Sequence, residues 1–111
     1  MFSIYRGKGF HVTFENDVTV SVQFGYGNYC ENRDEYEKLG GLHIPEFVES
    51  ADAEIAIWQG SSGKDSSVWI TREFMKEILN SEHDDDVLGY CNADTVLKAL
   101  VWAENYNKEV S

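Results

Sequence analysis

The sequence predicts a single α+β domain spanning residues 1–111. In it, an antiparallel β-sheet, built as a hairpin or meander, carries a C-terminal helix packed on one face and a short second helix. Three observations support this fold class. Apolar and polar residues alternate from Phe10 to Phe24, which is the two-residue period of half-buried strands. Apolar residues recur at helical spacing from Ala93 to Val101. A chain of 111 residues that is 42% hydrophobic is long enough to bury one core.

The N-terminal region has the pattern of a β-hairpin preceded by a further strand. Its two alternating runs are joined by Glu15–Asp17, whose short polar side chains suit a tight turn. Phe2 and Ile4 continue the apolar parity ahead of a turn that contains glycine, so a short strand is expected there. The apolar residues that share one face of the hairpin are Phe10, Val12, Phe14, Val18, Val20, Val22 and Phe24.

Two more strands and the short helix are predicted in the second half of the chain. Ala53–Trp58 alternates again, and Val68–Ile70 is another β-prone run. The link Gln59–Ser67 is rich in glycine and serine, as expected for the hairpin loop between them. Thr71 is then placed to cap a short helix over residues 72–80.

The final helix has a clear start signal. Asn92 or Asp94 is suited to cap it, and its apolar spacing continues to about Asn105. This helix is expected to lie across the sheet and to leave the opposite face more polar. Earlier in the chain, residues 25–41 are expected to form a long ordered loop with a helical turn near Asp34–Leu39.

The charge of the chain restricts the classes of partner. Twenty acidic residues against nine basic ones give a net charge of −11. Such a surface repels phosphate groups, so we expect no direct binding to nucleic acid or to an anionic membrane, and a protein with a basic surface is the natural partner. No apolar run approaches the roughly 20 residues needed to cross a bilayer, and the first residues lack a leader pattern. We therefore expect a cytoplasmic protein.

The residues that commonly carry chemistry do not form a known motif. Cys30 and Cys91 fit no CxxC spacing, and reduced thiols are expected. Together with the three histidines His11, His43 and His83 they match no zinc motif, and the acids of 82–86 lack the alternate spacing of a calcium loop. We expect no metal, no cofactor and no catalytic residue, hence a non-enzymatic protein. The three tryptophans are expected in the core, namely Trp58, Trp69 and Trp102.

Several segments resemble, in the same order, a group of small uncharacterised proteins found in bacteriophage and prophage genomes. The resemblance implies a phage origin and a setting in the cytoplasm of the host cell, but it carries over no catalytic residue and no known activity. The segments that carry it are Val18–Gly25, Tyr26–Cys30, Ala53–Trp58, Val68–Ile70 and Asp86–Tyr90.

The acidic residues are concentrated in two segments, 31–54 and 82–86. Two acidic patches of this kind can imitate the phosphate spacing of DNA and occupy a basic groove. The leading hypothesis is therefore an inhibitor that binds a host nucleic-acid-handling defence complex, as DNA-mimicking anti-CRISPR and anti-restriction proteins do; a purely solubilising role is the simpler alternative. The candidate partner-binding residues are Glu31, Asp34, Glu35, Glu37, Glu46, Glu49, Asp52, Glu82, Asp84, Asp85 and Asp86.

Two further hypotheses belong to other classes. Gly25-Tyr26-Gly27 and Arg6-Gly7-Lys8-Gly9 are reminiscent of loops that cradle phosphate with backbone amides. Arg6, Lys8, Tyr26 and Tyr29 would add charge and stacking surface, which suggests a binder or sponge for a nucleotide signal. The last alternative is a structural or assembly protein of the phage particle.

Overall fold

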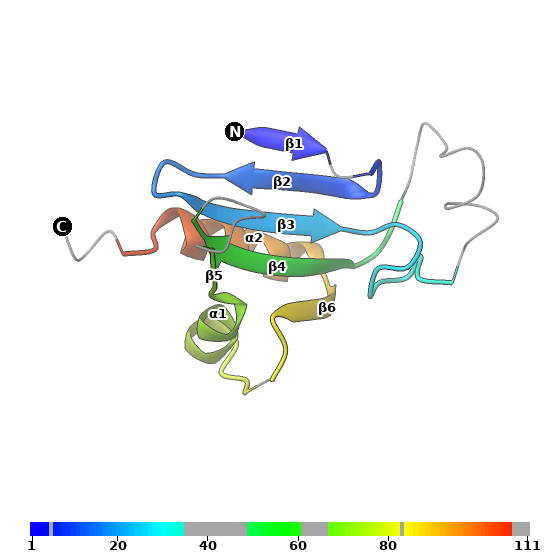
Figure 1. Ribbon diagram of the computed structural model, residues 1–111. Helices are drawn as coiled ribbons and strands as arrows, with labels where there is room; N and C mark the ends of the chain where they lie inside the picture. The colour runs from blue at the N-terminus through cyan, green and yellow to red at the C-terminus, as the bar shows by residue number, and fades with distance from the viewer. Residues whose placement is uncertain (5, 35–48, 61–66, 83, 108–111) are drawn as a thin grey trace.

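The computed structural model describes residues 1–4, 6–34, 49–60, 67–82 and 84–107. This part of the chain forms a six-stranded antiparallel sheet and two helices, which confirms the predicted α+β class (Figure 1). In chain order the elements are β1 (Phe2–Ile4), β2 (Gly9–Thr13), β3 (Val18–Gln23), β4 (Ala53–Gln59), β5 (Val68–Trp69), α1 (Thr71–Ile78), β6 (Val87–Cys91) and α2 (Ala93–Glu104).

The sheet runs from β1 through β2 and β3 to β4, whose outer edge is shared by two strands. The predicted hairpin is β2–β3, in register from Gly9 opposite Gln23 to Thr13 opposite Thr19. On the far side of β4, β5 pairs with its last two residues, and β6 pairs with its first half through an irregular register between Ala53 and Ile55. The sequence pattern does not predict a strand at β6.

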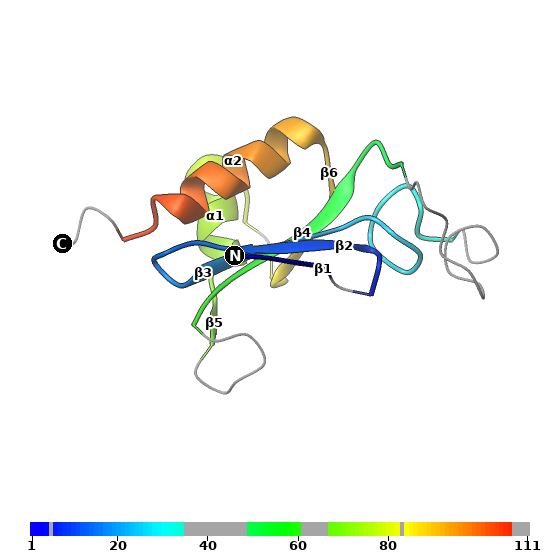
Figure 2. The same cartoon turned by 90° about the horizontal axis from the view of Figure 1, so that it is seen from above.

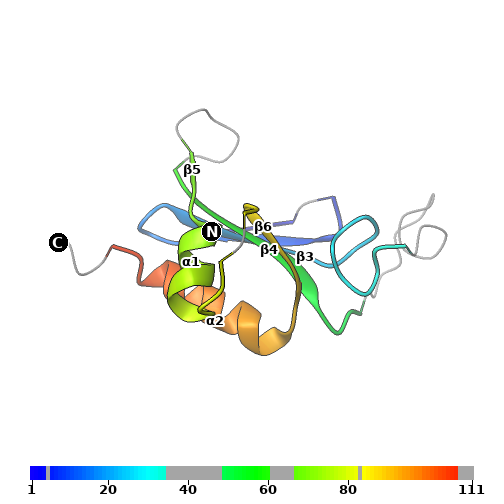
Figure 3. The same ribbon diagram turned by 90° about the horizontal axis from the view of Figure 1, so that it is seen from below.

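Both helices lie on the same face of the sheet, as the views from above and below show (Figures 2 and 3). Valines of β3 and isoleucines of β4 point toward them and are buried. Ala99 and Ala103 of α2 are completely buried, and such small side chains allow a helix to approach a sheet closely. Each buried Val or Ile side chain contributes roughly 1.5–3 kcal/mol, so this layer supplies most of the stability.

Asn92 caps α2 as predicted, since its side chain accepts a hydrogen bond from the Thr95 N–H at 2.9 Å. The other end of α2 is held by the hairpin turn. The Asn16 side-chain amide donates to the carbonyl oxygens of Ala103 at 2.9 Å and Tyr106 at 3.2 Å, while its own oxygen accepts from the Val18 N–H at 3.1 Å. Asn16 therefore both stabilises the turn and attaches the end of α2 to it.

The prediction that Thr71 caps α1 is wrong. Thr71 is instead the first residue of the helix and is completely buried. The N-cap position belongs to Ile70, which makes no side-chain capping bond. The Thr71 hydroxyl instead bonds to the backbone of Ile57, accepting from its N–H at 2.8 Å and donating to its carbonyl at 3.2 Å. Ile57 is the residue of β4 that lies between the stretches paired with β5 and β6, so the hydroxyl takes the place of a missing strand.

Candidate functional site

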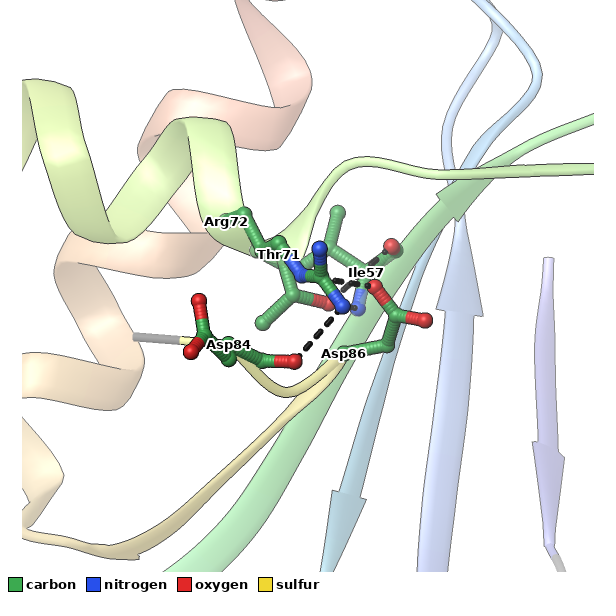
Figure 4. Close-up of polar contacts among 5 residues, drawn as sticks. All are labelled: Ile57, Thr71, Arg72, Asp84 and Asp86. Carbon is green, nitrogen blue, oxygen red and sulfur yellow. Dashed lines mark hydrogen bonds and ion pairs between the residues drawn. The ribbon is translucent and has the colours of Figure 1, made fainter. Parts of the chain in front are cut away.

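The segment Ser81–Asp86, here called the acidic loop, joins α1 to β6 and is tied to the start of α1 by one arginine (Figure 4). The Arg72 Nη2 atom donates to the carbonyl oxygen of Asp84 at 2.6 Å. The Arg72 Nε atom lies 3.4 Å from Oδ1 of Asp86, which forms an ion pair. Two residues of the acidic loop are thus held by one guanidinium.

The position of Arg72 is set by the core. Its neighbour Thr71 is buried and bonded to Ile57, so the backbone of Arg72 starts from a fixed point (Figure 4). Asp84 uses its main-chain oxygen in the contact, and its carboxylate points away from the guanidinium. Asp84 and Asp85 are both exposed, so their charges face solvent. His83 lies outside the described residues.

In the other acidic segment, three carboxylates bind the protein's own backbone. Glu31 and Asp52 lie side by side: the Glu31 N–H donates to Asp52 Oδ1, and the Glu31 carboxylate accepts from the Ala51 N–H, both at 2.6 Å. Glu54 accepts from the Tyr29 N–H at 2.9 Å and from the Asn28 side chain at 3.2 Å. These three acids fasten the 25–34 loop to the start of β4.

The acidic loop and the described acids Glu31, Asp52 and Glu54 lie at opposite ends of β6 rather than together. Val87, next to the acidic loop, pairs with Ala56, whereas Cys91 pairs with Ala53 beside the second segment. Figure 1 shows the acidic loop and the start of β4 at the two ends of β6. Of the remaining candidates, Asp34, Glu49 and Glu82 are exposed. The last three, Glu35, Glu37 and Glu46, lie outside the described residues, as do most of the helical turn expected at 34–39 and His43.

The glycine loops bring together two of the four residues of the nucleotide hypothesis. The Lys8 ammonium lies 5.7 Å from the centre of the Tyr26 ring, while Tyr29 lies near Arg33 instead. Gly25 is required for this arrangement, because a Cβ there would come within 2.9 Å of the Lys8 side chain. Arg6 has a positive φ of 52° in the turn after β1.

The amides of the Gly25–Gly27 loop are already engaged within the protein. The Gly25 N–H donates to the Asn28 side chain at 3.0 Å, and the Gly27 N–H donates to the carbonyl of Arg33 at 3.0 Å. A phosphate cradle needs such N–H groups to point at the ligand. An anion bound at this loop could therefore contact its side chains but not the N–H groups of Gly25 and Gly27.

The face of the sheet opposite α1 and α2 carries an aromatic group that the sequence pattern does not predict. The rings of His11 and Trp69 each meet the Trp58 indole edge to face, with centroids 5.2 Å apart. Trp58 and Trp69 lie opposite each other in register. The predicted core position is correct for Trp58, which is buried, and Trp102 is partly buried against the core, whereas Trp69 remains half exposed. The alternation of side chains along the strands places His11, Trp58 and Trp69 on the polar face. This alternation is the sequence signal that could have predicted the group.

Within the described chain, two buried polar atoms on this face lack a hydrogen-bond partner. Trp58 Nε1 and Gln23 Oε1 have no hydrogen-bond partner among the described residues. The hydroxyls of Thr13 and Thr19 bond to each other at 2.8 Å. Burial of the imidazole lowers the pKa of His11 below its usual 6.5. A neutral imidazole is therefore favoured beside the indole.

Both cysteines are free, buried thiols. Burial raises the pKa of Cys91 to about 11, with a smaller contribution from the negative charge of Asp52, and burial likewise raises the pKa of Cys30. Neither thiol is therefore activated for nucleophilic attack. Within the described ranges, no three His, Cys, Asp or Glu side chains are grouped so as to hold a metal ion.

No helix in the part of the chain that the structure describes is both long and apolar enough to span a membrane. Comparison with protein-family models found no match. No curated protein matches the chain. No solved structure matches it either.

Proposed function

We propose that this chain is a non-enzymatic binding protein whose acidic loop occupies a basic groove on another protein, where nucleic acid would otherwise bind. The charge balance supports this. The chain carries 20 acidic against nine basic residues, a net charge of −11, and one of its arginines, Arg72, is already paired with Asp86. The chain as a whole therefore carries an excess of negative charge that attracts a cationic surface.

The observation that carries the proposal is the contact between Arg72 and the acidic loop. The guanidinium holds the Asp84 carbonyl and the Asp86 carboxylate. The Asp84 carboxylate points away from it, and Asp84 and Asp85 are both exposed to solvent. Residues that are already held in place, as Asp84 and Asp86 are, lose less conformational entropy on binding than free ones. In the second segment, by contrast, Glu31, Asp52 and Glu54 are engaged with the backbone of their own chain.

The class of partner follows from the charge that would complement the loop. Proteins that bind nucleic acid neutralise phosphates with Lys and Arg, and the same groove accepts carboxylates presented at a similar spacing. We assign the partner to the nucleic-acid-handling defence complexes of a bacterial host, in keeping with the phage origin that the sequence resemblance implies. The protein would then act as a competitive inhibitor, as anti-CRISPR and anti-restriction proteins do.

A small-molecule role at the glycine loop is the second candidate. The approach of Lys8 to the Tyr26 ring favours it, because a cation and an aromatic face together suit a nucleotide. The internal use of the Gly25 and Gly27 amides argues for the acidic loop instead.

Capture from a nuclease-treated bacterial lysate tests the proposal. The immobilised full chain is loaded at roughly 50 mM salt, and bound proteins are eluted in parallel with short duplex DNA or RNA and with roughly 200 mM salt. We expect the same nucleic-acid-binding proteins in both eluates. The Asp84→Lys/Asp85→Lys variant should capture about a tenth as much or less, because it reverses both outward charges. Its Arg72 contact to the Asp84 carbonyl remains possible, since that contact uses the main chain.

The matched control is Glu15→Lys, which reverses an exposed acid in the β2–β3 turn, far from the acidic loop. It should capture the partner as the wild type does. Binding that resists both salt and nucleic-acid competition, or that survives reversal of Asp84 and Asp85, would contradict the proposal.

A further inference from the structure

The outer edge of β1 is open in the part of the chain that the structure describes. The Met1 amino group donates to the Thr13 carbonyl, and the Thr13 N–H donates to the Met1 carbonyl, each at 2.8 Å. Bonded pairs alternate along antiparallel strands, so Ser3 also pairs inward, and the N–H and C=O groups of Phe2 and Ile4 point away from β2. This edge therefore presents two residues ready to pair with another strand.

The side chains at this edge are apolar and almost fully exposed, at 80% for Phe2 and 81% for Ile4. They lie opposite Val12 and Phe10 in register, so they project on the helix side of the sheet. There α2 packs against β3 and β4 and leaves β1 uncovered (Figure 2). An open strand edge is thus combined with an uncovered apolar pair.

The N-terminal segment that forms this edge is balanced in charge. Residues 1–30 hold two acids, Glu15 and Asp17, against two bases, Arg6 and Lys8. The opposite edge of the sheet carries β6 and the acidic loop. Two copies that each carry −11 repel one another least when they approach through β1.

We propose that β1 pairs antiparallel with β1 of a second copy, which joins the two sheets about a two-fold axis at Ser3. In this register Phe2 of one copy lies opposite Ile4 of the other, and the outward N–H and C=O groups of both residues are paired. The strand is thus complementary to itself, as a two-fold interface requires. Directly opposed apolar side chains on one sheet face stabilise such pairing.

The dimer is weak and dissociates on dilution. A three-residue strand pair buries less than the roughly 1,200 Å² of a stable specific interface. Salt should strengthen it by screening the repulsion between two acidic copies. Binding of the acidic loop to a basic partner has the opposite salt dependence, so the dimer and the proposed function stand or fall separately.

Sedimentation of the full chain over a wide range of concentrations tests the dimer. We expect a monomer–dimer equilibrium that shifts toward dimer at higher salt. Ile4→Pro removes an outward N–H without removing a bond to β2, and Phe2→Lys adds a charge at the centre of the apolar pair. Each should weaken the dimer by roughly tenfold or more. The two variants act by different means, so if one of them does not fold, the other still tests the dimer.

The control is Leu97→Lys, which replaces an equally apolar residue that is 60% exposed on α2. It should leave the dissociation constant of the dimer unchanged. A chain that stays monomeric at every concentration would overturn the proposal. A dimer that persists in both β1 variants would also overturn it. A dimer that is lost in Leu97→Lys would overturn it too, because the interface would then lie on α2.

Discussion

Thr71 lies beside Ile57, the residue of β4 between the stretches paired with β5 and β6. Its hydroxyl satisfies both backbone groups of Ile57 in a fully buried position, together with the Ile70 N–H, which donates to the Ile57 carbonyl at 2.9 Å. A buried N–H group that loses its partner costs the full desolvation penalty. One side chain thus connects the sheet to the start of α1.

Thr71→Val tests this role, since it keeps the shape of the side chain and removes the hydroxyl. We expect the free energy of unfolding to fall by about 1–3 kcal/mol, or a Tm lower by roughly 4–8 °C for each kcal/mol. Thr71→Ser keeps the hydroxyl and should lose less in the same denaturant titration. A valine variant as stable as the serine variant would show that the bond to Ile57 contributes nothing.

His11 makes stability depend on pH near neutrality. Burial lowers its pKa below 6.5 in the folded protein, so the unfolded chain binds a proton at pH values where the folded protein does not. The free energy of unfolding therefore falls as the pH drops through about 6.5. In His11→Phe, which keeps a ring beside Trp58, this part of the loss should disappear when Tm is followed from pH 7.5 to 5.5. Equal losses in both proteins would exclude His11 as the titrating group.

Among the elements, the two helices are joined by paired polar contacts over an aromatic one. Trp102 Nε1 donates to Glu77 at 2.6 Å and the Tyr106 hydroxyl donates to Glu73 at 2.7 Å, while the Trp102 ring lies 5.6 Å from Phe74. Both acids belong to α1, while Trp102 lies in the last turn of α2 and Tyr106 follows just after the helix. The contacts fix how the short helix sits against the long one.

The hydrogen bond to Glu73 raises the pKa of Tyr106 to about 12, with further contributions from burial and from the charges of Glu73 and Glu77. The folded state keeps this proton longer than the unfolded chain, so the contact stabilises below pH 10 and is lost as the pH rises toward 12. Glu73→Gln should lower the Tyr106 pKa markedly in an absorbance titration against Tyr106→Phe, and Glu77→Gln should lower it less. The reverse order would contradict the assignment.

Much of the fold follows from local patterns. The hairpin is predicted because alternation and a polar turn are short-range signals, and α2 is predicted because its spacing and the Asn92 cap agree. β6 is not predicted, because it is short, contains Gly89 and takes a positive φ of 55° at Tyr90, which obscures a strand pattern. The start of α1 is wrong by one residue because the Thr71 hydroxyl is committed to β4, a contact that no local pattern reveals.

The candidate site is predictable only as a distribution of charge. The sequence shows that 82–86 is acidic, but Arg72 meets this segment through a contact set by the tertiary structure. Likewise, nothing local shows that Glu31, Asp52 and Glu54 bind the backbone while Asp84 and Asp85 face solvent. Tertiary structure thus sorts acids of equal appearance into structural and available ones.

At the scale of the whole molecule, charge and apolar surface lie at opposite edges of one sheet. The β1 edge is apolar and balanced in charge, and the β6 edge carries the acidic loop. A dimer through β1 would therefore leave an acidic loop free at each outer end. Such an arrangement would let one dimer engage two basic surfaces.

The central claim, that the acidic loop is a binding surface, is tested most directly by the salt dependence of affinity for the captured partner. Asp85→Lys and Glu15→Lys each add two positive units, which changes the net charge from −11 to −9. The wild type and Glu15→Lys should lose affinity alike, by roughly tenfold or more between about 50 and 200 mM salt. Asp85→Lys should bind more weakly, with a shallower salt dependence. Equal losses in the two variants, or an affinity that ignores salt, would contradict the claim.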